Sequence, residues 1–153
     1  MASERETPFA PILLMVDSSK TATRAARRAV ELAAILKCRI YAVTVVDTET
    51  LTQLLKGKIL VQDEMEEFEA DLTISSERYL KLAAKVAEEA GVDMESRLLK
   101  GGAHQTILAQ QKELNAGLVV LGGFSYSMTK RDLVSKAKQL IIDELSCPVL
   151  IVR

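Results

Sequence analysis

The amino-acid sequence predicts one α/β domain, built on a parallel sheet with helices on both faces. Short apolar segments of strand character alternate with segments whose apolar residues recur at helical spacing, which is the pattern of such a sheet. The chain has 153 residues, a length typical of a single domain, and 48% of them are hydrophobic. We therefore expect residues 1–153 to form one domain, with a flexible end at residues 1–7.

The first part of the chain predicts two strands with a helix between them. Residues 9–16 are continuously apolar, as in a strand buried on both faces, and residues 39–46 are rich in β-branched side chains. Residues 21–36 place mostly alanine and valine on one helical face. Asp17, at the end of the first strand, has the chemistry of a helix cap; it could equally bind a ligand from the same place.

The apolar pattern in the middle of the chain, residues 47–100, is less regular. Residues 47–61 contain apolar positions interrupted by Gly57, which fits a short helix or a lid over a site. Residues 62–90 show a helical pattern that ends at Gly91, a residue suited to a helix C-terminus. A weaker strand is expected at residues 92–100. These segments form a crossover like the others, so the sheet gains a third parallel strand.

The last part of the chain predicts helix, strand, glycine loop, helix and strand. A helix is expected at residues 103–114 and a buried strand at residues 118–121, followed by Gly122 and Gly123. A final amphipathic helix, residues 130–145, leads to the last strand, Val149–Val152. In parallel sheets, ligands bind beyond the carboxyl ends of the strands, which directs attention to Asp17 and to this glycine loop.

The composition argues against some classes of binding partner and indicates where in the cell the protein is expected. Twenty basic residues against 21 acidic ones leave a net charge of −1, which argues against nucleic acid or an anionic membrane as a partner. Apolar runs are too short to span a bilayer, and the first residues lack the apolar core of a secretory signal. The two cysteines, Cys38 and Cys147, are expected to be free and buried. We expect a cytoplasmic protein.

The sequence lacks the patterns of the common catalytic sites. It contains no GxSxG, no GxGxxG and no P-loop, and its one histidine, His104, has no neighbouring nucleophile. We expect His104 to be an exposed surface residue, and we expect no zinc site because the ligands are too few. An acidic cluster at residues 64–71 is expected to be a solvated helix face. The chain is therefore expected not to be an enzyme, a weak ATPase being the residual alternative.

The last strand has the character of an uncovered edge. Val149–Val152 is apolar and stands one residue from the end of the chain. An apolar edge strand invites aggregation unless something pairs with it. Pairing with the same strand of a second copy would bury it in a closed two-fold dimer. We therefore expect a homodimer through Val149–Val152.

The order of these segments resembles the universal stress protein family along nearly the whole chain. The segments that carry the resemblance are ILLMVDSS, AVTVVD, LLKGGAHQTIL, LVVLGG and CPVLIVR. It implies a Rossmann-like sheet of five parallel strands in the order 3-2-1-4-5, and a homodimer. Within the resemblance, Asp17 matches the aspartate that contacts adenine and ribose, and Val45 matches the residue whose backbone meets the adenine.

The phosphate loop of the family's ATP-binding branch is altered in this chain. That loop reads Gly, two residues, Gly, nine residues, then Gly with Ser or Thr. Gly122 matches its first glycine and is followed by Gly123. Ser125 stands at the second glycine, and Ser135 with Lys136 stands at the final pair. The resemblance thus implies a cofactor site for ATP or another adenine nucleotide, with or without magnesium, formed by these five residues together with the adenosine contacts.

The substitutions leave two hypotheses open. A serine in place of glycine adds a Cβ and costs roughly 1 kcal/mol where φ is positive. Against this, the loop carries hydroxyl donors and the basic residues Lys130, Arg131, Lys136 and Lys138, which suit an anion. The first hypothesis is a dimeric stress-response protein regulated by an adenine nucleotide. The second is a dimeric interaction module of the same fold that binds no nucleotide.

Overall fold

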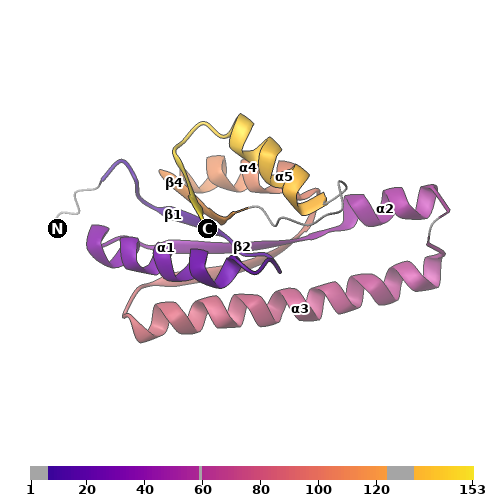
Figure 1. Ribbon diagram of the computed structural model, residues 1–153, viewed down its shortest axis with the longest axis horizontal. Helices are drawn as coiled ribbons and strands as arrows, with labels where there is room; N and C mark the ends of the chain where they lie inside the picture. The colour runs from indigo at the N-terminus through magenta and orange to yellow at the C-terminus, as the bar shows by residue number, and fades with distance from the viewer. Residues whose placement is uncertain (1–6, 59, 124–132) are drawn as a thin grey trace.

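The computed structural model describes residues 7–58, 60–123 and 133–153, with the side chains of residues 133–135 excepted. Strands and helices alternate along the described chain (Figure 1). In chain order the elements are β1 (Ile12–Met15), α1 (Ala22–Leu36), β2 (Ile40–Asp47), α2 (Thr48–Lys56), α3 (Gln62–Glu89), β3 (Met94–Gly101), α4 (Ala103–Leu114), β4 (Leu118–Gly122), α5 (Leu133–Glu144) and β5 (Val149–Val152).

The strands form one parallel sheet in the order β3-β2-β1-β4-β5. β1 lies in the centre, where Ile12 is in register with Ile40 of β2 and with Leu118 of β4. All four residues of β1 are buried, as expected for a strand covered on both faces. The predicted fold class and the strand order are confirmed. The order reverses beside β1, so the carboxyl ends of β1 and β4 flank the switch point.

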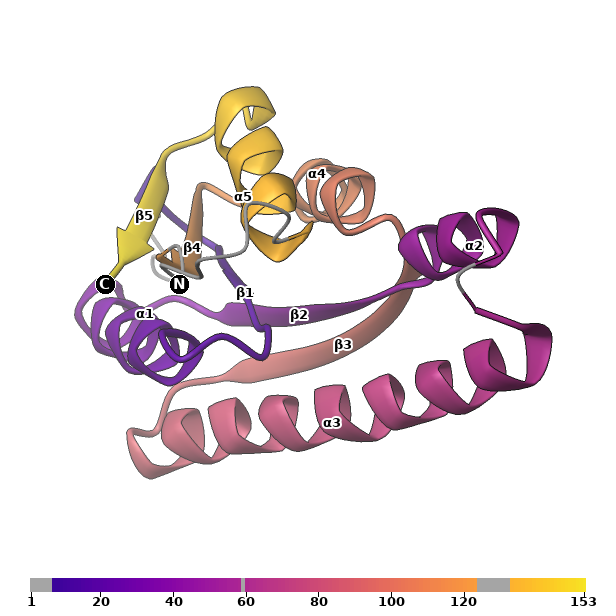
Figure 2. The ribbon, with the colours of Figure 1, turned by 45° about the vertical axis from the view of Figure 1, so that its right-hand side comes forward.

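Helices cover both faces of the sheet (Figures 1 and 2). α1 and α3 lie on one face, where alanines of both helices pack against alternate strand residues such as Ile12 and Leu14. α4 and α5 lie on the other face, where Ile107 and Ile141 pack against Leu13. Each strand of the centre therefore contributes successive residues to two separate cores, because side chains alternate across a sheet.

Residues 47–61, the ambiguous segment, contain the helix α2. α2 follows β2 directly, and its N-terminus is capped by Asp47, whose Oδ1 accepts a hydrogen bond from Thr50 N at 3.0 Å. Figure 2 shows α2 beyond the end of β2, with α3 returning beneath it. The interpretation as a short helix is confirmed. This placement puts α2 beside the carboxyl edge of the sheet.

The predicted start of the first strand differs from the structure. β1 begins at Ile12 rather than at residue 9, because the preceding residues turn: Ala10 N donates to Thr7 O, and Phe9 is 43% exposed. Gly91 has a φ of +68°, which agrees with its predicted place at the end of α3. Of residues 1–7, which are predicted to be flexible, residues 1–6 lie outside the described residues, as does the start predicted for the last helix.

No helix in the described part of the chain combines the length and the apolar character that crossing a membrane requires.

Candidate functional site

A cavity of about 320 Å³ opens at the carboxyl edge of the sheet. Its floor comes from the ends of β1 and β2, and its walls come from α2 and α3, with one residue each from α4 and α5. The lining residues are Met15, Val16, Asp17, Ser18, Thr44, Val45, Val46, Asp47, Thr50, Leu51, Leu54, Phe68, Leu72, Ser75, Ser76, Tyr79, Ala103 and Ala137. The position next to the switch point is where a parallel α/β sheet places its ligand.

The apolar walls of the cavity follow from the way α2 is attached. The cap at Asp47 turns the chain sharply after β2, and Leu51 and Leu54 then point to the cavity from one turn of α2. Leu51 is almost fully buried. Phe68 and Leu72, spaced by four residues on α3, close the other side. The cavity is therefore mostly apolar, with polar groups gathered at the strand ends.

Asp17 lines this cavity, and one of its two carboxylate oxygens is buried. Its Oδ1 accepts from Ser19 N at 2.8 Å. Its Oδ2 is buried and accepts no hydrogen bond from the described residues, although the ammonium of Lys138 lies 3.1 Å away. The partner of this buried oxygen is therefore the Lys138 ammonium, in an ion pair.

Asp17 does not cap α1, contrary to one of its two predicted roles. The residue before the helix is Thr21, and no side chain makes a capping hydrogen bond there. The carboxylate instead holds the turn that follows β1, through Ser19 N. The helix begins at Ala22, five residues after Asp17, and Thr21 occupies the cap position.

Lys138 is the unexpected component of the site. Its side chain is 1% exposed, and its Nζ donates to Gly123 O at 3.2 Å in addition to pairing with Asp17. A buried ammonium is unfavourable unless it is paired and hydrogen-bonded, and both conditions are met here. Sequence reasoning counted Lys138 only among the charges near the loop. The missed signal was its spacing, because it stands four residues after Val134 and three before Ile141, within the apolar stripe of α5.

Gly122 ends β4 and Gly123 follows it, and both residues lie against neighbouring segments of the chain. Gly123 N donates to Val152 O at 2.7 Å, and Gly123 O accepts from Thr21 Oγ1 at 3.1 Å as well as from Lys138. A Cβ on Gly122 would collide with Thr21 Oγ1 and would lie 3.0 Å from the Thr21 Cβ. Gly122 is thus required by the close approach of α1, whether or not a phosphate binds nearby.

The predicted site residues divide into three groups. Asp17 and Val45 both line the cavity, and Gly123 is connected to Asp17 through Lys138. Lys136 is exposed and does not line the cavity. It stands two positions before Lys138 on α5, a rotation of about 200° around the helix, so the two lysines point in different directions. Ser125 and the side chain of Ser135 lie outside the described residues.

The charges of the cavity wall favour a ligand whose enclosed part is neutral. Asp17 and Asp47 are the acidic residues of the lining, and none of the described lining residues is lysine, arginine or histidine. Both carboxylates already accept a backbone N–H. An aromatic, largely apolar group that also donates hydrogen bonds suits such walls. Among the described residues, no group of three or more His, Cys, Asp and Glu side chains could hold a metal ion.

His104 differs from its prediction as an exposed residue. Its side chain is 19% exposed, and its Nε2 contacts Glu144 Oε2. His104 stands in the first turn of α4 and Glu144 at the end of α5, so the pair connects these two helices. His104 does not line the cavity, although Ala103 beside it does. The expectation failed because the carboxylate partner is 40 residues away in the sequence.

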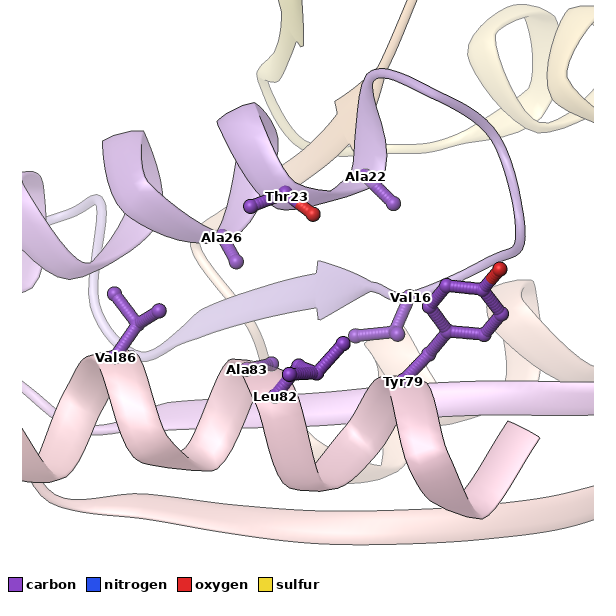
Figure 3. A pocket seen from close by; sticks show the side chains of 8 residues that line it. All are labelled: Val16, Ala22, Thr23, Ala26, Tyr79, Leu82, Ala83 and Val86. Carbon is purple, nitrogen blue, oxygen red and sulfur yellow. The ribbon is translucent and has the colours of Figure 1, made fainter. Parts of the chain in front are cut away.

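A second, much smaller cavity lies between α1 and α3 (Figure 3). Tyr79, Leu82 and Val86 project from α3 towards Ala22 and Ala26 of α1. Its volume of about 20 Å³ has room for roughly one water molecule. This cavity is a packing gap between the helices and is too small for a ligand.

Comparison with known proteins identifies universal stress proteins as relatives of this chain. The model of the universal stress protein family matches residues 8–153. A universal stress protein of Methanocaldococcus jannaschii is 27% identical over 149 residues, which cover 97% of this chain and 84% of that protein. A putative universal stress protein of Staphylococcus aureus is 30% identical, over 93% of this chain and 82% of its own length.

Solved structures of universal stress proteins share the fold. One from Burkholderia pseudomallei has a TM-score of 0.74 at 22% identity, covering 97% of this chain and 98% of that one. A universal stress protein from Archaeoglobus fulgidus in complex with dAMP has a TM-score of 0.64 at 21% identity, covering 96% and 100%. Another, in complex with cAMP, has 0.65 at 21%, covering 93% and 94%. This chain belongs to the universal stress protein family.

Proposed function

We propose that the protein is a cytoplasmic, homodimeric stress-response protein that binds an adenine nucleotide as a regulatory ligand and does not turn it over. ATP or another adenine nucleotide, with or without magnesium, would occupy the cavity at the carboxyl edge. The observation that carries the proposal is the mostly apolar cavity of about 320 Å³ at the carboxyl edge, with the Asp17 carboxylate among its lining residues.

The chemistry of adenosine matches these walls. Adenine is flat and largely apolar, so Leu51, Leu54 and Phe68 suit its faces. A ribose hydroxyl is a donor, and the Asp17 carboxylate in the cavity lining is an acceptor. Hydrogen bonds to a carboxylate are about twice as strong as those between neutral groups. The two universal stress proteins with dAMP and cAMP bound add support, because their fold is the fold of this chain.

Two measurements test the nucleotide proposal. The supernatant of freshly purified, denatured protein is analysed for nucleotide, and the protein is titrated calorimetrically with ATP, ADP and AMP, with and without magnesium. Binding tighter than millimolar for at least one of them is expected. If all three bind more weakly, the nucleotide proposal is wrong, and the interaction module without nucleotide takes its place. A steady-state assay for phosphate release is expected to show no turnover.

An Asp17→Asn variant identifies the site. Asparagine keeps an oxygen for Ser19 N but loses the charge, so every adenine nucleotide should bind at least roughly tenfold more weakly. Asp93→Asn is the matched control, because Asp93 is an exposed carboxylate at the opposite edge of the sheet. Equal effects of the two changes would mean that the ligand binds elsewhere.

The dimer is proposed on the position of β5. β5 is an outer strand of the sheet, paired on one side with β4, and Ile151 on it is 40% exposed. An exposed apolar edge is a site for pairing with another strand. We propose that β5 of one copy pairs with β5 of a second copy.

Light scattering tests the dimer through Ile151→Lys. A lysine on the edge strand should shift the protein to a monomer at micromolar concentration, because charge on an edge blocks pairing. Ile35→Lys is the control, since Ile35 is a more exposed isoleucine, 75% exposed, on α1. A monomeric wild type, or a dimer that survives Ile151→Lys, would contradict the proposed interface.

A further inference from the structure

We propose that Lys138 determines which adenine ligand the site selects: adenosine with a single phosphate attached to its ribose, linear or cyclic. Such a nucleoside monophosphate would be preferred over uncharged adenosine and would bind at least as well as a triphosphate without metal. The inference rests on the proposed adenine site and adds a selecting residue to it. Its evidence is the buried Lys138–Asp17 pair next to the cavity.

The ion pair as a whole is not required for packing at this position. Lys138 lies among the apolar residues of α5, and Ile141, one turn further, is fully buried. Buried ion pairs often stabilise a fold less than apolar side chains in place of both partners, although loss of one partner alone is costly. A buried lysine and carboxylate beside a cavity therefore indicate a role in recognising a ligand.

The ammonium is placed to meet a phosphate carried by a ribose. An ammonium has three N–H donors, and the described residues account for a hydrogen bond to Gly123 O and the charge contact with Asp17 Oδ2. A ribose hydroxyl bound to the same Oδ2 would bring the sugar next to Nζ, so a phosphate on that sugar lies within a few bonds of the positive charge. Charges in a site shielded from water interact strongly.

The pair also removes a repulsion that would otherwise exclude anions. Asp17 alone would present a negative charge to a phosphate at the switch point, and Asp47 adds another at the cavity wall. Lys138 neutralises the nearer of the two at 3.1 Å. Without it, the carboxylate that holds the ribose would oppose the phosphate attached to the same ribose. The lysine thus allows one site to hold a sugar hydroxyl and an anion together.

Among the described residues, Lys138 supplies the one buried positive charge of the site, which favours one phosphate. In the described part of α5 before Lys138, the other lysine is Lys136, which is exposed. A contact to an exposed lysine is weakened by water and salt. From these two lysines, further phosphates would gain little, while each adds repulsion from Asp47 in the cavity wall. This charge distribution favours a monophosphate.

The experiment compares adenosine, AMP and ATP by titration calorimetry, without magnesium, on the full chain and on Lys138→Met. The measured quantity is the ratio of the dissociation constants of adenosine and AMP, in which effects on the adenosine half cancel. In the wild type, AMP should bind tighter than adenosine and no weaker than ATP. In Lys138→Met the adenosine-to-AMP ratio should fall by roughly tenfold or more.

Three variants keep the test sharp. Lys136→Met, the exposed comparator, should change the ratio by much less, and Lys85→Met on the far part of α3 should not change it. If Lys138→Met does not fold, Asp17→Asn with Lys138→Met removes both charges at once and should still show the lowered ratio. Methionine approximates the length of lysine, so the packing of α5 is retained.

The outcomes separate this inference from the function on which it rests. A wild type that binds neither adenosine nor nucleotide overturns both. A wild type that binds adenosine and AMP equally, a ratio unchanged by Lys138→Met, or ATP bound about tenfold tighter than AMP overturns the role of Lys138 alone. A gain in AMP affinity on Lys138→Met also overturns it, and would show that the ammonium occupies the place of the phosphate.

Discussion

The two edges of the sheet carry ion pairs of the same chemical kind in opposite environments. At the carboxyl edge, Lys138 and Asp17 pair at 3.1 Å with side chains that are 1% and 12% exposed. At the amino edge, Arg39 and Asp93 pair at 2.8 Å with side chains that are 43% and 67% exposed. The shorter pair is the more exposed one, so distance alone does not indicate which pair matters.

Burial decides the difference between these pairs. Exposed ion pairs contribute little to stability because water and salt screen them. A buried pair carries a desolvation penalty when it forms, and the loss of one partner leaves an uncompensated buried charge. At the amino edge Arg39 also lies near Tyr41 and Glu95, in an open network that water can enter. The carboxyl edge instead keeps charges where folding alone would favour apolar groups. A site that retains them against that cost is the better candidate for function.

The largest expected effect is the loss of half of the buried pair. Lys138→Met leaves Asp17 buried without its counter-charge, and we expect the free energy of unfolding to fall by about 3–5 kcal/mol. Asp17→Asn combined with Lys138→Met should recover most of the loss, because no unpaired charge remains and Ser19 N keeps an acceptor. Urea unfolding of the three proteins measures these differences. A single variant as stable as the wild type would remove the distinction between the two edges.

Glycines at the two edges provide the next comparison. Gly122→Ala should destabilise the protein by about 1–3 kcal/mol, because the added Cβ collides with Thr21. Gly91→Ala, at the amino edge, meets no atom within 4 Å, but its φ of +68° should cost about 1 kcal/mol. Thermal unfolding measures both changes.

Replacing Thr21 distinguishes the steric clash at Gly122 from the cost of the positive φ at Gly91. Thr21→Ala should reduce the cost of Gly122→Ala, because it removes the atom that the Cβ meets, and should leave the cost of Gly91→Ala unchanged. Strict additivity of Gly122→Ala and Thr21→Ala would show that space is not the constraint at Gly122.

The fold could be predicted from the sequence because its signals are local. The buried strand β1 and the alanine face of α1 are each visible within a few neighbouring residues. The strand order itself came from the family resemblance. Only the edges of elements were misplaced, as at β1, where a turn at Thr7–Ala10 is hidden inside an apolar run.

The site could be predicted only in part, because it depends on contacts between distant segments. Asp17 and Val45 were found, since the end of a strand is a local feature and the family pattern marks both. Lys138 and Asp17 are 121 positions apart, and His104 and Glu144 are 40 apart. Such partners have no signal in residue spacing. A charged residue inside an apolar stripe, as at Lys138, is the nearest local indication.

A weaker effect is expected from breaking the exposed pair. Asp93→Asn removes the partner of Arg39, and the change in the urea midpoint should be a small fraction of that for Lys138→Met. The difference should shrink further at high salt, because mobile ions already screen this pair. The effect of Lys138→Met should be nearly independent of salt, since its pair is buried. Equal salt dependence at both edges would contradict the assignment of one pair to water and the other to the interior.

The smallest effect concerns the thiols, both of which lie towards the amino edge. Cys38 precedes β2 and Cys147 precedes β5, and partial burial raises the pKa of each thiol. The thiolate is the reactive form, and a raised pKa lowers its fraction at any pH below that pKa. At about pH 8, below the ordinary thiol value, both should therefore react with iodoacetamide more slowly than in the urea-unfolded chain.

The pH dependence of that reaction locates the cause. If burial acts through the pKa, the rate in the folded protein should keep rising with pH beyond the point at which the unfolded chain levels off. If burial merely blocks the reagent, the folded rate should stay low at every pH. Variants with a single cysteine, Cys38→Ala and Cys147→Ala, assign each rate. A folded rate equal to the unfolded one would mean that water reaches both thiols fully. The amino edge would then differ from the carboxyl edge in the exposure of its thiols as well as in the exposure of its ion pair.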